Sequence, residues 1–131
     1  MDVKVLLDTH AFVWAVTAPD RLSDTARDLL SDPTVPLLVS AASAWEISTK
    51  HRAGRWPEVT VLLRQYDRLV ERLGAQHLPL SSDHALTAGG LEWDHIDPFD
   101  RALAAQSMRE GLALVTRDAA FADLAGLSTH W

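Results

Sequence analysis

Four carboxylates stand where apolar, strand-like runs end and helical segments begin. Asp8 follows VKVLL, Glu46 lies in the segment after PLLVS, Asp100 is part of DPFDR, and Asp118 comes just after LALVT. In an open parallel α/β sheet, ligands bind outside the carboxyl ends of the strands, so these scattered acids are expected to meet in one cleft. Clustered carboxylates repel one another, and hard oxygen ligands suit Mg²⁺ or Mn²⁺. These residues therefore predict a metal-dependent phosphodiester hydrolase.

The first two acids also have structural explanations. Asp8 interrupts a buried apolar run, where a carboxylate is costly unless it is paired or metal-bound, but it can also cap the following helix. Glu46 stands three residues after Ser43, the spacing of a capping box, and four before Lys50, the spacing of a helical ion pair. Ser40, directly after the strand, is the better candidate for the cap.

The other two acids lie at predicted helix starts. Asp97 precedes Pro98, which is the expected pair for a helix N-cap and first helical residue, so we assign Asp97 a structural role. Asp100 would then be the third helical residue, where a carboxylate also favours the helix dipole. Asp118 can cap the last helix. Helix capping alone gives no reason for four acids to gather at one edge of one sheet, so the four acids together favour a metal-binding site.

The elements that must position these acids alternate between strand and helix, which predicts an α/β fold with a mainly parallel sheet flanked by helices. Strands are expected at residues 3–7, 36–40, 75–80 and 112–116. Helices are expected around 11–15 and at 22–32 with Ser23 as N-cap, 41–53, 58–73, 82–91, 98–110 and 119–125.

The chain of 131 residues is 47% apolar and is expected to form one domain, residues 1–131. It has no cysteine, which excludes disulfides and thiolate metal sites and fits a reducing cytoplasm. No apolar run approaches the roughly 18 residues of a membrane span. Charged residues interrupt the N-terminal apolar stretch, which argues against a signal peptide. We therefore expect a cytoplasmic protein with no membrane contact.

The net charge of −6 argues against broad binding to duplex nucleic acid, because that binding relies on neutralising phosphates. Lys50 and Arg52 lie near the end of the helix that carries Glu46. Favourable interaction with the helix dipole accounts for both, and a position beside the cleft would make them contacts for RNA or a protein partner.

With LLDTHAFVW, SAASAWEISTK, HIDPFDRALAAQS and LVTRD in that order, the chain resembles the PIN domains. More narrowly, it is similar to the VapC-type ribonuclease toxins of type II toxin–antitoxin systems. The match runs from about residue 3 to residue 121 and is weakest between 56 and 76. The resemblance implies a three-layer fold, Mg²⁺-dependent endonucleolytic cleavage of RNA, a homodimer, and inhibition by a small VapB-like antitoxin.

The resemblance also implies roles for individual residues. The family's metal-binding acids carry over to Asp8, Glu46, Asp100 and Asp118. Asp8 and Asp100 are the expected direct ligands of Mg²⁺, for which Mn²⁺ is a plausible substitute. The other two acids would bind directly, through water, or through a second ion.

Further residues accompany these acids. Thr9 follows the first acid, as it often does in the family, and Thr116 would orient a carboxylate or a water. Arg101 and Arg117 each follow a site acid, so they are candidates for contacts with phosphate or antitoxin, although surface ion pairs would also explain them. His95 is noted because the family often places a histidine just before DPFDR.

Other chemistries find less support. The phosphate-binding patterns G-x-x-x-x-G-K-[ST] and G-x-G-x-x-G and the nucleophile elbow G-x-S-x-G are all absent. A receiver-like signalling domain would have paired acids after the first strand and a lysine after the last. A PIN-type nuclease of RNA processing and a non-catalytic protein-binding module remain as alternatives.

Overall fold

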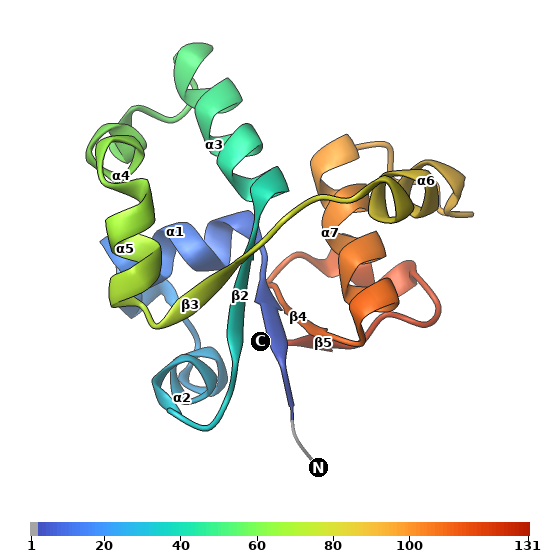
Figure 1. Ribbon diagram of the computed structural model, residues 1–131, viewed down its shortest axis with the longest axis horizontal. Coiled ribbons are helices and arrows are strands. Elements are labelled where there is room, and N and C mark those ends of the chain that lie inside the picture. Colours follow the sequence, from blue (N-terminus) through green and yellow to red (C-terminus); the bar gives the residue numbers. More distant parts are fainter. Residues whose placement is uncertain (1–2) are drawn as a thin grey trace.

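The computed structural model describes residues 3–131 and contains a five-stranded sheet whose pairings are all parallel (Figure 1). The strand order is β3-β2-β1-β4-β5, so β1 lies between β2 and β4. The strands are β1 Val5–Leu7, β2 Leu37–Ser40, β3 Ala75–Leu78, β4 Ala113–Val115 and β5 Thr129–His130. The α/β class with a parallel sheet, predicted from the alternating signals, is confirmed.

Helices connect these strands. The α-helices are α1 Thr9–Thr17, α2 Asp24–Ser31, α3 Ala41–Arg52, α4 Thr60–Arg64, α5 Tyr66–Arg72, α6 Ser82–Gly90 and α7 Pro98–Glu110. Three 3₁₀ helices are η1 Pro19–Arg21, η2 Pro57–Val59 and η3 Ala119–Asp123. The predicted N-caps Ser23 and Asp97 are confirmed, since each side chain accepts hydrogen bonds from backbone N–H groups of the first turn.

Apolar side chains cover both faces of the sheet because successive strand residues point to opposite sides. Val5 and Leu7 belong to a core that includes Phe12 of α1, while Leu6 packs in a second core with Leu103 of α7. Figure 1 shows α1, α4 and α5 on one side of the molecule and α6 and α7 on the other. The predicted three-layer arrangement is therefore confirmed.

The carboxyl ends of the central strands lie at one edge of the sheet. Leu7 is in register with Val39 of β2 and with Val115 of β4, so the residues that follow these three strand positions emerge side by side. Asp8 then caps α1, and Ser40 caps α3 by accepting a hydrogen bond from the backbone N–H of Ala42. This edge therefore carries the start of two helices and the first of the candidate acids.

The single helix predicted for 58–73 is wrong. The segment forms η2, α4 and α5, with a break at Gln65, whose φ of −123° and ψ of 27° leave the helical region. Leu62 and Val70 both lie in the core. Because α4 contacts α1 and α3 whereas α5 contacts β3, the chain bends between two packing partners, and helical periodicity does not record that bend.

The C-terminal segment also differs from the prediction. The helix expected at 119–125 is the 3₁₀ helix η3, and the edge strand β5 was not predicted because it is only two residues long. Residues 3–131 include no helix that is both long and apolar enough to cross a membrane.

Candidate active site

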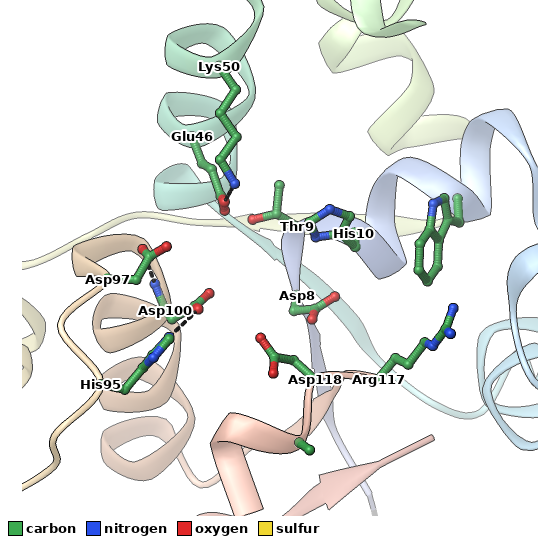
Figure 2. A pocket seen from close by; sticks show the side chains of 12 residues that line it. Asp8, Thr9, His10, Glu46, Lys50, His95, Asp97, Asp100, Arg117 and Asp118 are labelled. Atoms are coloured by element: carbon green, nitrogen blue, oxygen red, sulfur yellow. Dashed lines mark hydrogen bonds and ion pairs between the residues drawn. The ribbon is translucent and has the colours of Figure 1, made fainter. Parts of the chain in front are cut away.

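A cavity of about 580 Å³ at the carboxyl edge of the sheet is lined by all four predicted acids (Figure 2). Asp8 comes from the end of β1 and Glu46 from α3, while Asp100 belongs to the first turn of α7 and Asp118 follows β4. The structure thus brings together acids from four separate segments. The remaining lining residues are Thr9, His10, Trp14, Lys50, His95, Asp97, Arg117 and Ala119.

Asp8 is buried, and both of its carboxylate oxygens accept hydrogen bonds. The backbone N–H of Ala11 donates to Oδ1 at 2.7 Å, and the hydroxyl of Thr116 donates to Oδ2 at 2.6 Å. Burial raises the pKa of Asp8 from its ordinary 3.8 to about 6, against the lowering effect of these two hydrogen bonds. The negative charges of Glu46 and Asp118 raise the pKa further. The predicted cap is therefore confirmed, and because Asp8 also lines the cavity, the cap does not conflict with the predicted site role.

Glu46 is buried on α3 with one oxygen engaged and one not. Its Oε2 forms an ion pair with Nζ of Lys50, as the helical spacing predicted. Its Oε1 is buried and meets no hydrogen-bond partner among residues 3–131. The alternative capping box with Ser43 does not form, because Ser40 caps the helix and Ser43 shares a 3.0 Å hydrogen bond with the hydroxyl of Thr9. A buried carboxylate oxygen without a partner is costly, which fits a site that receives a cation or water.

Asp100 is half-buried at the start of α7 and is held by a histidine. Its Oδ2 lies 2.7 Å from Nε2 of His95, and its backbone N–H donates to the capping carboxylate of Asp97. Burial raises the pKa of Asp100 from 3.8 to about 6, while the hydrogen bond from His95 lowers it. The charges of Asp97 and Glu46 contribute to the rise. The histidine that the motif pattern singled out thus contacts a site acid directly.

Asp118 is exposed at the mouth of the cavity, and Thr116 connects it to Asp8. The backbone N–H of Asp118 donates to the hydroxyl oxygen of Thr116 at 3.0 Å, and that hydroxyl donates to Asp8. Oδ1 of Asp118 caps η3 by accepting from the backbone N–H of Ala120 at 2.9 Å. Figure 2 shows the side chains of Asp8 and Asp118 next to each other, with Asp100 across the cavity. One threonine therefore fixes the relative position of two acids.

The donor chemistry of this cavity fits a hard divalent cation. The acids offer oxygen ligands, burial and mutual repulsion raise the pKa of Asp8 and of Asp100, and Oε1 of Glu46 has no hydrogen-bond partner in the part of the chain that the structure describes. Across residues 3–131 no three His, Asp or Glu side chains are close enough together to form a ready-made metal site. This spacing does not conflict with Mg²⁺, which usually keeps several waters and is held by one or two carboxylates.

Arg101 makes contacts that differ from both predictions for it, a contact with phosphate or antitoxin and a surface ion pair. Its guanidinium donates four hydrogen bonds, 2.7–3.0 Å long, to the backbone carbonyls of Ala88, Leu91, Trp93 and His95. It forms no ion pair within the described residues, and it does not line the cavity. The predicted contact with phosphate or antitoxin is therefore replaced by a clamp on the segment between α6 and α7.

The other predicted basic contacts are divided between the cavity and the surface. Lys50 lines the cavity and is paired with Glu46. Arg117 is exposed, lines the cavity, and places its guanidinium carbon 6.0 Å from the centre of the Trp14 ring. Arg52 lies in the last turn of α3, outside the cavity lining, where it complements the helix dipole.

His10 and Trp14 also line the cavity, although neither was among the predicted site residues. Burial lowers the pKa of His10, and the charge of Lys50 acts in the same direction, whereas nearby carboxylates raise it. The available signal was spacing, because residues four apart share one helix face and His10 follows the acid that caps that helix.

The PIN domain family matches residues 5–127 of this chain. Among curated proteins, the chain is similar to Ribonuclease VapC16 of Mycobacterium tuberculosis, with 38% identity over 71 residues. That alignment covers 54% of this chain and 48% of the relative, so it spans about half of the relative's length.

Solved structures share the fold at lower sequence identity. VapBC2 from Rickettsia felis, bound to a DNA fragment from its promoter, has a TM-score of 0.69 and 15% identity, with 98% of each chain covered. VapBC-5 from Mycobacterium tuberculosis has a TM-score of 0.60 and 20% identity, covering 98% of this chain and 96% of the other. VapC20 from the same species, described as a sarcin–ricin loop cleaving toxin, has a TM-score of 0.57 and 16% identity, covering 95% and 98%.

Proposed function

Because this chain belongs to the PIN domain family, as its motifs predicted, we propose that it is a Mg²⁺-dependent endoribonuclease and the toxin of a type II toxin–antitoxin pair. The observation that carries the proposal is that Asp8, Glu46, Asp100 and Asp118 line one cavity at the carboxyl edge of the sheet. The relatives described as a ribonuclease and as a sarcin–ricin loop cleaving toxin support RNA as the substrate. Membership of this family argues against the receiver-like alternative.

Asp8 and Asp100 would hold the ion, with Glu46 and Asp118 as further ligands, directly or through water. When bound, Mg²⁺ supplies positive charge that stabilises phosphate oxygens and promotes ionisation of a water, and Mn²⁺ has the same preference for oxygen ligands. The raised pKa of Asp8 and of Asp100 means that both carboxylates lose their protons only above about pH 6 unless a cation favours the charged form.

The chain's own side chains would keep these carboxylates in place. Thr116 holds Asp8 by a hydrogen bond, and His95 does the same for Asp100. Lys50 holds one oxygen of Glu46, and the other oxygen, which has no hydrogen-bond partner among residues 3–131, would be free to bind the ion or a water. Such outer contacts commonly change metal affinity or activity by roughly 10- to 100-fold.

The partner in this proposal is a VapB-like antitoxin. The similar solved structures from Rickettsia felis and Mycobacterium tuberculosis are VapBC toxin–antitoxin proteins. Beside the cavity, Trp45 and Ile96 are 59% and 87% exposed, and Trp45 packs edge to face on Phe99. Exposed aromatic and aliphatic side chains of this kind commonly anchor a protein partner. We also propose that the chain forms a homodimer.

Cleavage of RNA by the purified protein tests the enzymatic part. Single-stranded RNA should be cut in the presence of Mg²⁺ or Mn²⁺ and remain intact with excess EDTA. Asp8→Asn and Asp100→Asn should each lower the rate by at least about 100-fold, because each removes a charged ligand. The control is Asp83→Asn, on the surface of α6, which should cut at the wild-type rate. Full activity in either site variant would remove the basis for the assignment.

Titration with the product of the adjacent gene tests the partner. The complex should form tightly and stop cleavage, and Trp45→Ser should weaken it by at least about tenfold if this side chain is an anchor. Light scattering should give the mass of a dimer for the isolated protein. Undiminished cleavage by a saturated complex would contradict the toxin assignment, and a strict monomer would contradict the dimer.

A further inference from the structure

One wall of the cavity that holds the four acids is formed by two aromatic rings and an arginine side chain. His10 and Arg117 lie on this wall, and Asp100 and Asp97 lie across the cavity (Figure 2). Trp14, which also lines the cavity, is next to both His10 and Arg117. His10 and Trp14 are four residues apart on α1, so they share one face of that helix. The sequence DTHAFVW therefore places two rings on one face of the helix whose N-cap is the site acid Asp8.

The two rings are adjacent but inclined to each other, so each presents its own face to the cavity wall. The centres of the His10 and Trp14 rings are 5.6 Å apart with an angle of 58° between the ring planes, and the guanidinium carbon of Arg117 lies 6.0 Å from the centre of Trp14. Beyond the cavity, His10 stacks on Trp56 at 4.9 Å with an angle of 29° between the ring planes. This arrangement extends the aromatic surface away from the acids.

Packing of Trp14 against the core does not account for the whole wall. The Trp14 ring is half-buried and contacts Trp131 edge to face at 5.9 Å, which holds the ring in a fixed orientation. His10 is exposed, and so is Arg117. A core-packing role therefore explains one side of Trp14 but not the two exposed groups beside it in the cavity.

We infer that His10, Trp14 and Arg117 form a stacking site for one nucleobase of single-stranded RNA, next to the phosphate on which the carboxylates act. This inference rests on the proposed function. A nucleobase offers a flat π face to an aromatic ring and to a guanidinium, and such stacking tolerates any base. The chain carries a net charge of −6, so neutralisation of phosphates should contribute less to its affinity for RNA than in a basic protein, and contacts with bases should contribute more. A duplex would hide the base, which makes the substrate a single strand or a loop.

Removal of single bases from the RNA tests this site. The probe is a fluorescent, short single-stranded oligoribonucleotide, together with a set in which each base in turn is replaced by an abasic ribose. Affinities are measured by anisotropy with Mg²⁺ in Asp118→Asn, which keeps the proposed ligands Asp8 and Asp100, and gels verify that the RNA stays intact. In Asp118→Asn, removal of one particular base should weaken binding by about tenfold. In the double variant Asp118→Asn/Trp14→Leu, in which leucine keeps apolar bulk at position 14 without a ring, removal of the same base should have no effect.

Two matched arginine variants provide a second test that does not require Trp14→Leu to fold. Arg21 and Arg117 both lie about 6 Å from the Trp14 ring, but only Arg117 lines the cavity. Arg117→Gln should weaken binding by about two- to fivefold, and Arg21→Gln should leave it unchanged. Equal effects of the two substitutions would overturn the proposal.

Other outcomes separate this inference from the proposed function. If base removal weakens binding equally with and without the Trp14 ring, the stacking site is overturned even when wild type cuts RNA. If instead Trp14→Leu weakens only the antitoxin complex, the wall belongs to the protein partner and the inference is again overturned. Base-dependent binding that requires the Trp14 ring, without any Mg²⁺-dependent cleavage by wild type, would support the site and contradict the nuclease.

Discussion

The hydroxyl of Thr116 donates a 2.6 Å hydrogen bond to Asp8, a residue 108 positions earlier in the chain. The pairing of β1 with β4 makes this contact possible, because Leu7 and Val115 are partners in the parallel ladder. The next residue on each strand then emerges at the same edge of the sheet. Thr116 also accepts the backbone N–H of Asp118, so its position fixes two acids at once.

Replacing Thr116 by valine should therefore lower cleavage while leaving the fold intact. The variant keeps the shape of the side chain but leaves Oδ2 of Asp8 without its donor, and the pKa of Asp8 should rise further because this hydrogen bond lowers it. We expect a loss of roughly 10- to 100-fold in cleavage rate and a shift of the pH profile to higher pH. Thr116→Ser restores the hydroxyl and should recover most of the activity. Equal losses in the valine and serine variants would show that packing of the methyl group, and not the hydrogen bond, matters.

Strand ends and helix caps could be predicted because they depend on local patterns. The apolar run before Asp8 and the Asp97–Pro98 pair place both acids correctly on their elements. The bend at Gln65 and the strand β5 could not be predicted in this way. Both depend on which neighbours the segment packs against, and apolar spacing does not contain that information.

The contacts of charged side chains were predicted less well than the positions of the acids. Arg101 follows Asp100 and was predicted to contact phosphate or antitoxin or to form a surface ion pair, yet it clamps four backbone carbonyls that lie before it in the chain. His10 was interpreted as a surface or loop residue, and Trp14 as a core residue or as part of an apolar groove for an antitoxin, so neither was predicted among the site residues. Only the fold shows that this face of α1 opens to the cavity.

Mg²⁺ should stabilise the folded protein. A concentration ten times the dissociation constant should add about 1.4 kcal/mol to the free energy of unfolding. Asp100→Asn should lose this gain because it removes a proposed ligand, while Asp83→Asn on the surface should retain it. Thermal or urea unfolding with and without Mg²⁺ measures the difference. A gain of equal size in Asp100→Asn would indicate that the ion binds elsewhere.

In the absence of divalent ions, Asp8→Asn should make the protein more stable at about pH 8. The folded-state pKa of Asp8, about 6, lies above its ordinary value of 3.8, so the folded state binds a proton more readily than the unfolded state. Burial of the charged Asp8 carboxylate therefore lowers the free energy of unfolding of the wild type. This loss has its full size above about pH 6 and disappears as the pH falls toward 4. The advantage of the variant should be about 1–3 kcal/mol at high pH and vanish near pH 4.

Urea unfolding in EDTA across this pH range measures the effect, with Asp32→Asn as a control of opposite sign. Hydrogen bonds from Thr34 lower the pKa of the exposed Asp32 carboxylate, so its small contribution to stability is lost as the pH falls. A stability difference for Asp8→Asn that does not change with pH would mean that lost hydrogen bonds, and not buried charge, dominate.

Arg101→Lys should loosen the segment from Leu91 to His95. Lysine keeps the charge but cannot reach four carbonyls with a planar fork, so we expect a loss of about 1–3 kcal/mol in stability. Hydrogen exchange of the amides in this segment should become faster, and activity should fall because His95 positions Asp100. The control is Arg109→Lys, whose partner Asp83 is on the surface, and it should change neither quantity. Unchanged exchange in Arg101→Lys would show that the clamp does not hold the segment.

Asp97 and Asp100 should respond in opposite ways although both line the cavity. Oδ1 of Asp97 accepts hydrogen bonds from the backbone N–H groups of Phe99 and Asp100, so Asp97→Ala should lower stability by about 1 kcal/mol as a lost cap. Activity should largely survive below the melting transition, and Asp97→Asn, which keeps a capping oxygen, should restore stability. Asp100→Ala should instead abolish cleavage with little loss of stability, because it removes a carboxylate with a raised pKa. Unfolding curves and cleavage rates of the three variants test this contrast, and an inactive but stable Asp97→Ala would place Asp97 among the catalytic acids.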